Sequence, residues 1–209
     1  ESILLRGYQS TDPGFYENSL IWQPFEGYVD GLEGYVVERK QSSEASVPFD
    51  FLSSIQGNFE NYEDDIGDEF DSPGIFCYRV VAMENQLGDI VYEGSKSNVI
   101  CLTEEPIVWI PNAFSPNGDE VNDWFPWAPG EAQVGFLGEP REGTPNFEMN
   151  VVSRWGTLMF HTESLDEPWD GTHEGQPVPM GIYAVHIRYL DGSGRWRNQS
   201  LHLSVFPEQ

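Results

Sequence analysis

The densest group of potential metal ligands in the sequence lies in one loop, SPNGDEVND at residues 115–123. Four oxygen-bearing side chains fall within seven of these residues: Asn117, Asp119, Asn122 and Asp123. A hard cation such as Ca²⁺ prefers oxygen ligands, although the spacing is not that of an EF-hand, whose fifth and twelfth positions would be Val121 and Ala128. The alternative is a loop in which these short side chains accept hydrogen bonds from neighbouring backbone N–H groups. The sequence leaves both interpretations open.

The tetrapeptide WDGT at residues 169–172 supplies one further carboxylate, that of Asp170. Added to the 115–123 loop, it would supply one more oxygen ligand for Ca²⁺. The alternative is a turn between strands that a buried Trp169 anchors. We expect the protein to require no cofactor, and Ca²⁺ is the ion for which the sequence offers ligands.

A second candidate site is the tripeptide RWG, formed by Arg154, Trp155 and Gly156. These three residues invite a partner-binding interpretation. The alternative is a hairpin in which Gly156 and Thr157 form the turn and Trp155 packs over neighbouring side chains. Under that alternative, Arg154 remains a candidate for contact with a partner.

The residues that usually carry catalysis are not arranged for it. Neither an H-E-x-x-H pattern nor a G-x-S-x-G, P-loop or G-x-G-x-x-G motif occurs in the sequence. The histidines are scattered along the second half: His161, His173, His186 and His202. Paired carboxylates are common, but with 35 acids some pairs are expected by chance. We therefore expect no enzymatic activity.

The two cysteines are placed for a disulfide across neighbouring strands. Residues 76–84 alternate as a strand, a turn is expected near Asp89, and residues 91–102 return. Antiparallel partners in such a hairpin have residue numbers that sum to about 178, as those of Cys77 and Cys101 do. The bond would add about 3–4 kcal/mol of stability by chain entropy. The alternative is two buried free thiols.

The rest of the chain also reads as short strands between turn residues. There are 21 glycines and 15 prolines, and no long stretch has a helical period. In the first half we predict further strands over residues 19–22 and 34–39. In the second half we predict strands over residues 107–114, 147–155, 158–162, 182–190 and 196–206.

The charge balance narrows the classes of partner. The sequence has 35 acids and 10 bases, a formal net charge of −25 at pH 7, and both halves are acidic. Such a field repels phosphate backbones, so we expect no nucleic-acid partner. Seven acids lie in residues 60–71, which form either a cation site or a solvated loop. No run of 18 apolar residues occurs, so we expect no membrane insertion.

The length suits two small domains. The 209 residues would form two domains of about 100 residues each, and TEEP at residues 103–106 is a short linker. We therefore predict an all-β chain of two consecutive β-sandwiches, residues 1–102 and residues 107–209. The chain starts at Glu1 without a methionine or a signal peptide, so we expect it to be the C-terminal piece of a longer protein.

The first half resembles a fibronectin type III domain. The resemblance rests on Trp22 in an early strand, on GYVVER at residues 34–39 and on FCYRVVAMEN at residues 76–85. The apolar positions alternate as in that family's Y-x-x-x-V-x-A-x-N strand, but Phe76 stands where the family has tyrosine. Phe76 has no hydroxyl for a tyrosine-corner hydrogen bond. The resemblance implies a β-sandwich that serves as a spacer.

The second half, about residues 107–206, resembles the gliding-motility-associated C-terminal domain, the type B sorting signal of the type IX secretion system. Four motifs in the family's order carry the resemblance: IPNAFSPNGDEVNDWF at 110–125, SRWGTLMF at 153–160, WDGT at 169–172 and PMGIYAVHIRY at 179–189. The family usually has glycine where Glu120 stands.

This resemblance implies that the second β-sandwich is immunoglobulin-like, so that the chain consists of two consecutive immunoglobulin-like or fibronectin type III-like β-sandwiches. It also implies recognition rather than reaction. It implies a C-terminal sorting signal that directs a large cargo, an adhesin or a secreted enzyme, through the periplasm and the type IX system to the cell surface or the medium. The implied partners are an outer-membrane protein of the PorP/SprF type and the translocon. One alternative is a carbohydrate-binding or adhesive module, which predicts an exposed strip of tryptophan or tyrosine on one sheet. Another is a structural accessory domain of an enzyme.

Overall fold

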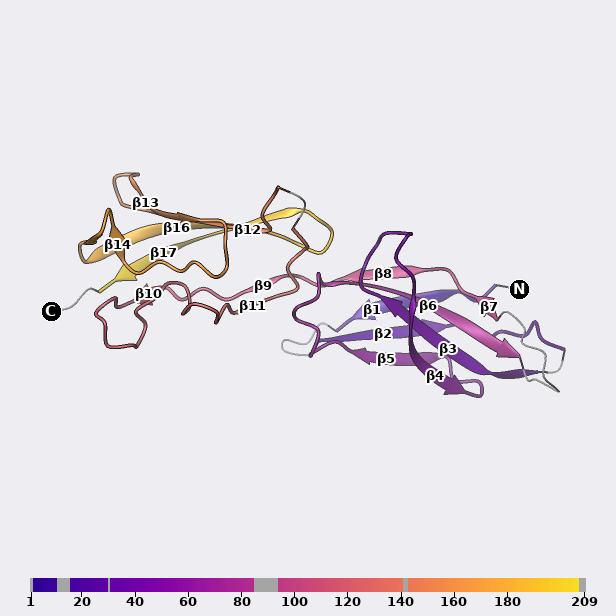
Figure 1. The fold of residues 1–209 in the computed structure, drawn as a ribbon. Coiled ribbons are helices and arrows are strands. Elements are labelled where there is room, and N and C mark those ends of the chain that lie inside the picture. The colour runs from indigo at the N-terminus through magenta and orange to yellow at the C-terminus, as the bar shows by residue number, and fades with distance from the viewer. Residues whose placement is uncertain (1, 11–15, 30, 85–93, 141–142, 207–209) are drawn as a thin grey trace. The chain divides into compact units, whose positions relative to one another are not determined.

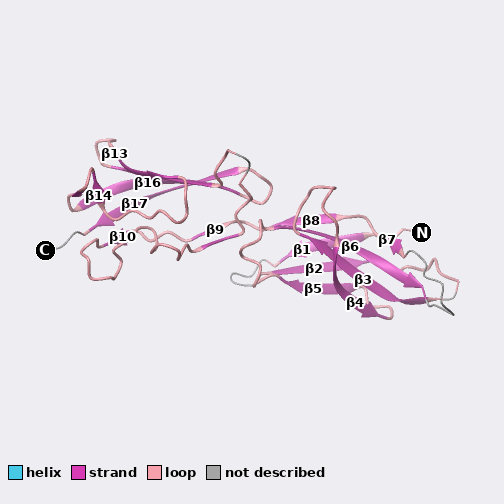
Figure 2. Cartoon of the chain, in the orientation of Figure 1, coloured by secondary structure: helices cyan, strands magenta, loops and turns pink. Residues whose placement is uncertain are grey.

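The computed structural model describes residues 2–10, 16–29, 31–84, 94–140 and 143–206 (Figure 1). These residues contain strands joined by loops and no helix (Figure 2). The chain divides into two compact units, Glu1–Glu104 and Glu105–Gln209. The predicted all-β class is therefore confirmed. Among the described residues there is no helix that is long and apolar enough to cross a membrane.

The first unit is a β-sandwich. Its described strands are β1 (Leu5–Gln9), β2 (Glu17–Trp22), β3 (Leu32–Lys40), β4 (Asp50–Gln56), β5 (Asn61–Asp65), β6 (Ile75–Glu84), β7 (Ser95–Lys96) and β8 (Ile100–Thr103). One antiparallel sheet has the order β1-β2-β5, and the other has the order β4-β3-β6-β7 with β8 also paired to β6. Both sheets contribute to the core, in which the rings of Trp22 and Tyr35 lie 5.3 Å apart.

Strand β6 confirms the strand predicted over residues 76–84. Cys77 in β6 faces Cys101 in β8, and the two form the predicted disulfide with their Cα atoms 4.0 Å apart. The residue numbers of paired residues sum to 178 along β8 but to 177 along β7, so the register shifts by one between these two strands. The expected turn near Asp89 lies outside the described residues.

The returning strand is broken, whereas the sequence predicts a continuous strand up to residue 102. Residues 97–99 separate β7 from β8. At this break the side-chain oxygen of Asn98 accepts a 2.8 Å hydrogen bond from the Leu5 N–H, and its amide donates a 3.1 Å bond to the Leu5 carbonyl. Leu5 belongs to β1, so the break lets Asn98 tie one sheet to the other.

The second unit is built on one five-stranded sheet. Its described strands are β9 (Ile107–Val108), β10 (Ala113–Phe114), β11 (Val134–Gly135), β12 (Phe147–Val152), β13 (Leu158–Thr162), β14 (Thr172–His173), β15 (Gln176–Pro177), β16 (Gly181–Leu190) and β17 (Trp196–Val205). The sheet has the order β10-β17-β16-β12-β13, in which only β10 and β17 run parallel to each other. Two-stranded pairs β9–β11 and β14–β15 complete the described strands.

The core of the second unit lies between this sheet and a layer that includes β9 and β11, as Figure 1 shows. The strands predicted over residues 182–190 and 196–206 form β16 and β17, whose alternate apolar side chains pack inward, with Val185 and Leu203 fully buried. The strand predicted over residues 107–114 is instead two short strands, because the chain passes Pro111 between them and changes partner from β11 to β17. The strand predicted over residues 147–155 ends at Val152.

Candidate functional site

The RWG segment forms a tight hairpin between β12 and β13. The Ser153 N–H donates a hydrogen bond to the Thr157 carbonyl, and the Gly156 N–H donates one to the Ser153 carbonyl, both at 2.9 Å. Gly156 has a φ of 82°, a left-handed conformation that favours glycine. The hairpin interpretation therefore describes the backbone, and it fixes the positions from which Arg154 and Trp155 extend.

The hairpin interpretation expected Trp155 to pack over neighbouring side chains, but Trp155 is largely exposed. Its side chain is 80% exposed, whereas Met159 and Phe160, which follow in β13, pack against the core. The guanidinium carbon of Arg154 lies 4.9 Å from the centre of the Trp155 ring, within the range of a cation–π contact. The hairpin thus presents an aromatic side chain and a cation together on the surface.

The hairpin also lines a pocket of about 380 Å³, which we call the Trp155 pocket. The other side of the pocket comes from the segment that enters β16, where Met180 and Ile182 are 65% and 63% exposed. Tyr183 lies deeper and its hydroxyl donates a 2.8 Å hydrogen bond to the Pro179 carbonyl. Two of the three sequence-predicted residues, Arg154 and Trp155, therefore lie at a hollow with exposed apolar side chains, the kind of surface to which proteins and peptides dock. Gly156 does not line the hollow and instead forms the turn.

Arg154 is the cation of this pocket. Among the described residues it forms no ion pair with a carboxylate, in contrast to Arg188, which pairs with Glu148 at 3.0 Å. Burial raises the pKa of the Tyr183 hydroxyl, and the positive charge of Arg154 acts in the opposite direction. A cation without a carboxylate partner, at the edge of a hollow, suits a ligand that brings its own acidic group.

The 115–123 loop is held together by its own side chains. The Asp123 carboxylate accepts hydrogen bonds from the backbone N–H groups of Asn117, Gly118 and Glu120 at 2.7–2.8 Å. These bonds, that from Gly118 above all, lower the pKa of Asp123. Asp119 accepts a 2.9 Å bond from the Val121 N–H. The loop therefore has the self-bonded geometry that the sequence left open as the alternative to Ca²⁺ binding.

The proposed Ca²⁺ ligands are only partly brought together. Asn117, Asp119 and Asp123 share the loop, and the Asn117 amide donates a 3.1 Å bond to Asp119. The Asp170 carboxylate accepts bonds from the N–H and hydroxyl of Thr172 at 2.9 and 2.8 Å. The described residues form no group of three or more His, Cys, Asp or Glu side chains suited to a metal. Ca²⁺ binding by the five predicted residues, Asn122 included, stays a prediction.

Two residues of the loop have a strained backbone. Glu120 and Asn122 have φ values of 69° and 55°, in the left-handed region that non-glycine residues adopt at a cost. The resemblance to the sorting-domain family implies glycine at position 120. Glu120 therefore occupies a conformation that suits glycine better.

The WDGT segment is the turn that the alternative interpretation expected. Trp169 is 1% exposed, and its indole N–H donates a 2.7 Å bond to the Thr172 carbonyl. Its backbone exchanges two hydrogen bonds with Phe125, at 2.8 and 2.9 Å. Trp169 thus anchors the turn in the core and connects it to the segment that follows the 115–123 loop.

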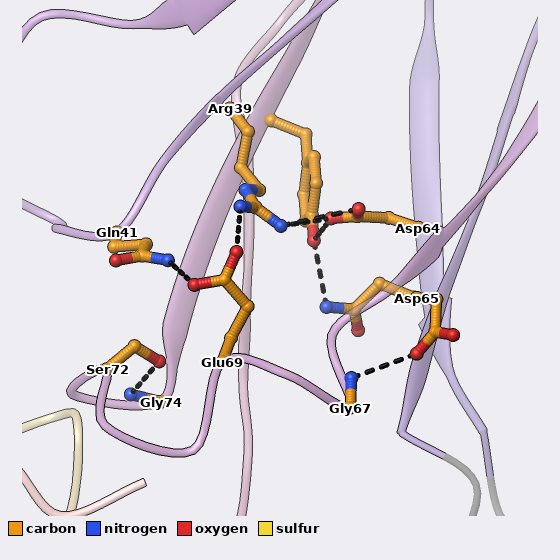
Figure 3. Close-up of polar contacts among 10 residues, drawn as sticks. Arg39, Gln41, Asp64, Asp65, Gly67, Glu69, Ser72 and Gly74 are labelled. Atoms are coloured by element: carbon orange, nitrogen blue, oxygen red, sulfur yellow. Dashed lines mark hydrogen bonds and ion pairs between the residues drawn. The ribbon is translucent and has the colours of Figure 1, made fainter. Parts of the chain in front are cut away.

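A polar network in the first unit is absent from the sequence-based predictions (Figure 3). Residues 60–71 are not a solvated loop, because residues 61–65 form β5 and Asp64 is 4% exposed. The Arg39 guanidinium pairs with Asp64 at 3.0 Å and with Glu69 at 2.5 Å. Tyr78 donates a 2.7 Å hydrogen bond to Asp64 and accepts a 2.9 Å bond from the Asn18 amide.

The network is structural, because it joins the two sheets across the sandwich. Asn18 and Asp64 belong to one sheet, whereas Arg39 and Tyr78 belong to the other. Burial and the hydrogen bond to Asp64 raise the pKa of Tyr78. Burial is the largest single influence on Glu69 and opposes its ionisation, but the hydrogen bonds from Arg39 and Gln41 and the charge of Arg39 together outweigh burial, so the pKa of Glu69 is lowered. The sequence alone does not indicate this network. It depends on the pairing of β2 with β5, in which Asn18 lies opposite Asp64.

Comparison with known proteins finds one family model that is similar to part of the second unit. Residues 108–203 match the family model described as the CHU_C type IX secretion signal domain, and the resemblance seen in the four motifs is confirmed. No curated protein matches the chain.

Two solved structures from chicken are similar in fold. The FN1–FN3 domains of CNTN1 are 16% identical with a TM-score of 0.38, and the match covers 99% of this chain and 65% of that chain. A segment of two fibronectin type III domains from tenascin is 15% identical with a TM-score of 0.48, and the match covers 98% of this chain and 99% of that chain.

Proposed function

We propose that this chain, whose residues 108–203 match a type IX secretion signal domain, is the sorting signal of a larger exported cargo. In this proposal residues 107–209 form the sorting signal, residues 103–106 are a linker and residues 1–102 are a fibronectin type III-like spacer. The cargo, an adhesin or a secreted enzyme, would pass through the periplasm and end on the cell surface or in the medium. The family match is the observation that carries the proposal.

The part of the sorting signal that contacts a partner would be the Trp155 pocket. Tryptophan and arginine are enriched among the residues that dominate binding energy at protein interfaces. Trp155 is 80% exposed on a hairpin with a fixed backbone, and Arg154 lies against it. Little conformational freedom would be lost on binding, because the hairpin is already ordered by two backbone hydrogen bonds. The partner would be an outer-membrane protein of the PorP/SprF type, or the translocon itself.

This function is recognition and assigns no catalytic role to any residue. Two carboxylates with several polar contacts support the structure: Asp123 organises a loop, and Asp64 joins two sheets. Ca²⁺ could at most stabilise the 115–123 loop in this proposal. Chemistry performed by the whole cargo would then belong to other parts of it.

The test is export of a reporter in a bacterium with a working type IX system. A periplasm-directed fluorescent protein is fused to residues 1–209, to residues 103–209 and to residues 1–102. We expect the whole chain to send the reporter to the cell surface or the medium, and residues 1–102 alone to leave it in the periplasm. In the native cargo, deletion of residues 103–209 should abolish export. Unchanged export after this deletion would refute the sorting function.

A further inference from the structure

A second hollow, on the second unit, is lined by three tryptophans and has a volume of about 320 Å³. We call it the Trp109 groove. Trp109 and Trp124 are 55% and 41% exposed, whereas Trp127 is 5% exposed and donates its indole N–H to the Leu165 carbonyl. The groove is separate from the Trp155 pocket, with which it shares no lining residue. Its size is at the lower end of the range for small-ligand sites, roughly 300–1,000 Å³.

The two exposed indoles are held on ordered backbone. The Trp109 N–H donates a 3.1 Å hydrogen bond to the Gln133 carbonyl, next to the β9–β11 pair. Trp124 lies between Asp123, whose carboxylate fixes the 115–123 loop, and Phe125, whose backbone is paired with Trp169. Rigid, exposed aromatic rings provide contact area without a large loss of conformational entropy on binding.

The polar side chains of the groove have unused hydrogen-bonding capacity. Four of them make no hydrogen bond within the described part of the chain: Glu120, Asn122, Glu131 and Gln133. Between them they offer carboxylate acceptors and amide groups that both donate and accept. The Asp123 carboxylate is different, because three backbone N–H groups already occupy it.

The exposed indole rings and the unpaired polar side chains of the groove together favour one class of ligand. Flat apolar rings beside free donors and acceptors suit a molecule with an apolar face and a rim of hydroxyl groups, which is the chemistry of a sugar ring. A purely apolar peptide would leave the four polar side chains unpaired and desolvated, at a cost. Glu120, Glu131 and a net charge of −25 repel an anionic ligand. The ligand should therefore be uncharged.

We propose that the Trp109 groove binds a neutral polysaccharide. Trp109 and Trp124 stack on sugar rings, and Asn122, Glu131 and Gln133 bond to their hydroxyl groups. The sorting domain would then also be a glycan-binding module. This activity is independent of the sorting function, because it uses different residues and requires no secretion partner.

The experiment is native gel electrophoresis of the 209-residue chain in gels that contain a soluble polysaccharide. Three neutral polymers are used, hydroxyethylcellulose, xylan and galactomannan, with polygalacturonate as the anionic comparison and a gel without polymer as the reference. We expect at least one neutral polymer to retard the chain and polygalacturonate not to. Trp109→Ala and Trp124→Ala should each weaken the apparent affinity about tenfold or more.

Trp155→Ala is the matched control, because it removes an exposed tryptophan of the same unit from outside the groove. It should be retarded like the unchanged chain. Thermal melting of all three variants checks that each is folded. The proposal is overturned if none of the three neutral polymers retards the chain, if polygalacturonate retards it equally, or if both groove variants are folded and still retarded.

Discussion

The Tyr78 hydroxyl donates a 2.7 Å hydrogen bond to the Asp64 carboxylate and thereby connects the two sheets of the first unit. Asp64 also accepts the Arg39 guanidinium at 3.0 Å, so the negative charge of this buried carboxylate is balanced. A buried carboxylate is stable only with such partners. The contact therefore marks the point at which the acidic strand β5 is held against the rest of the sandwich.

Tyr78→Phe should destabilise the first unit without changing its packing. The substitution removes one hydrogen bond to Asp64 and leaves the Asn18 amide without an acceptor, and such losses cost about 1–3 kcal/mol in the free energy of unfolding. Denaturant unfolding of the full chain, followed by circular dichroism, measures the change. Tyr8→Phe is the control, since Tyr8 is 54% exposed and its loss should have little effect. Equal stability of the two variants would contradict the role of this contact.

The raised pKa of Tyr78 makes the protein sensitive to alkali. The unfolded chain loses this proton near pH 10, whereas burial and Asp64 keep the hydroxyl protonated in the folded state. Stability should therefore fall above pH 10, by about 1.4 kcal/mol per pH unit from this one group. The difference in unfolding free energy between the unchanged chain and Tyr78→Phe should shrink over this range. A difference that stays constant from pH 9 to pH 11 would refute the assignment.

The disulfide could be predicted from the sequence because it depends on local order. Strand alternation and the sum of two residue numbers placed Cys77 opposite Cys101, and the structure has this pairing. The break between β7 and β8 could not be predicted in the same way. It depends on the hydrogen bonds between Asn98 and Leu5, which lie 93 positions apart in the chain.

The network around Asp64 and the exposure of Trp155 could not be predicted from the sequence. The acidic run of residues 60–71 resembles a solvated loop, and only the folded chain brings Arg39, 25 positions away, next to Asp64. Trp155 was expected to pack over its neighbours, since large aromatic residues are usually covered. The left-handed turn at Gly156 instead leaves it exposed. In both places a tertiary contact or a backbone conformation decided the outcome.

Glu120→Gly should stabilise the second unit. Glu120 has a φ of 69°, which costs a non-glycine residue about 1–2 kcal/mol, and glycine gives back about half of this through the entropy of the unfolded chain. We therefore expect a net gain of about 0.5–1 kcal/mol in unfolding free energy. Glu120→Ala is the control, because it removes the same side chain and keeps the strain. If alanine stabilises as much as glycine, removal of the charge and not of the strain is the cause.

Removal of Ca²⁺ distinguishes the two interpretations of the 115–123 loop. The Asp123 carboxylate already accepts three backbone N–H groups, so the self-bonded interpretation predicts the same melting temperature of the chain with EGTA and with added Ca²⁺. A lower melting temperature in EGTA that Ca²⁺ restores would instead establish a Ca²⁺ site. In that case Asp119→Ala should abolish the response.

Acid should loosen the same loop. Backbone hydrogen bonds, led by that from Gly118, lower the pKa of Asp123 in the folded chain. The stability that this carboxylate contributes is therefore complete above its unfolded pKa of about 4 and is lost as the pH falls through its lower, folded value. The Asp123 carboxyl resonance, followed by NMR between pH 6 and pH 2, should titrate below that of a model peptide. A midpoint at or above the peptide value would contradict the hydrogen-bonded loop.

Trp155→Ala should impair export while leaving the fold intact. Trp155 is 80% exposed and packs on no core residue, so its removal should not change the melting temperature. If the Trp155 pocket is the contact with the secretion machinery, loss of a central aromatic side chain costs about 2 kcal/mol, or roughly a thirtyfold weaker complex. Reporter export by the full chain should fall accordingly, and Arg154→Glu should have a similar effect by reversing the charge of the pocket.

Trp109→Ala, which removes an exposed tryptophan from the other groove, should be exported normally. Normal export of Trp155→Ala and of Arg154→Glu would show that another surface is recognised, and the deletion of residues 103–209 would then test the sorting function alone.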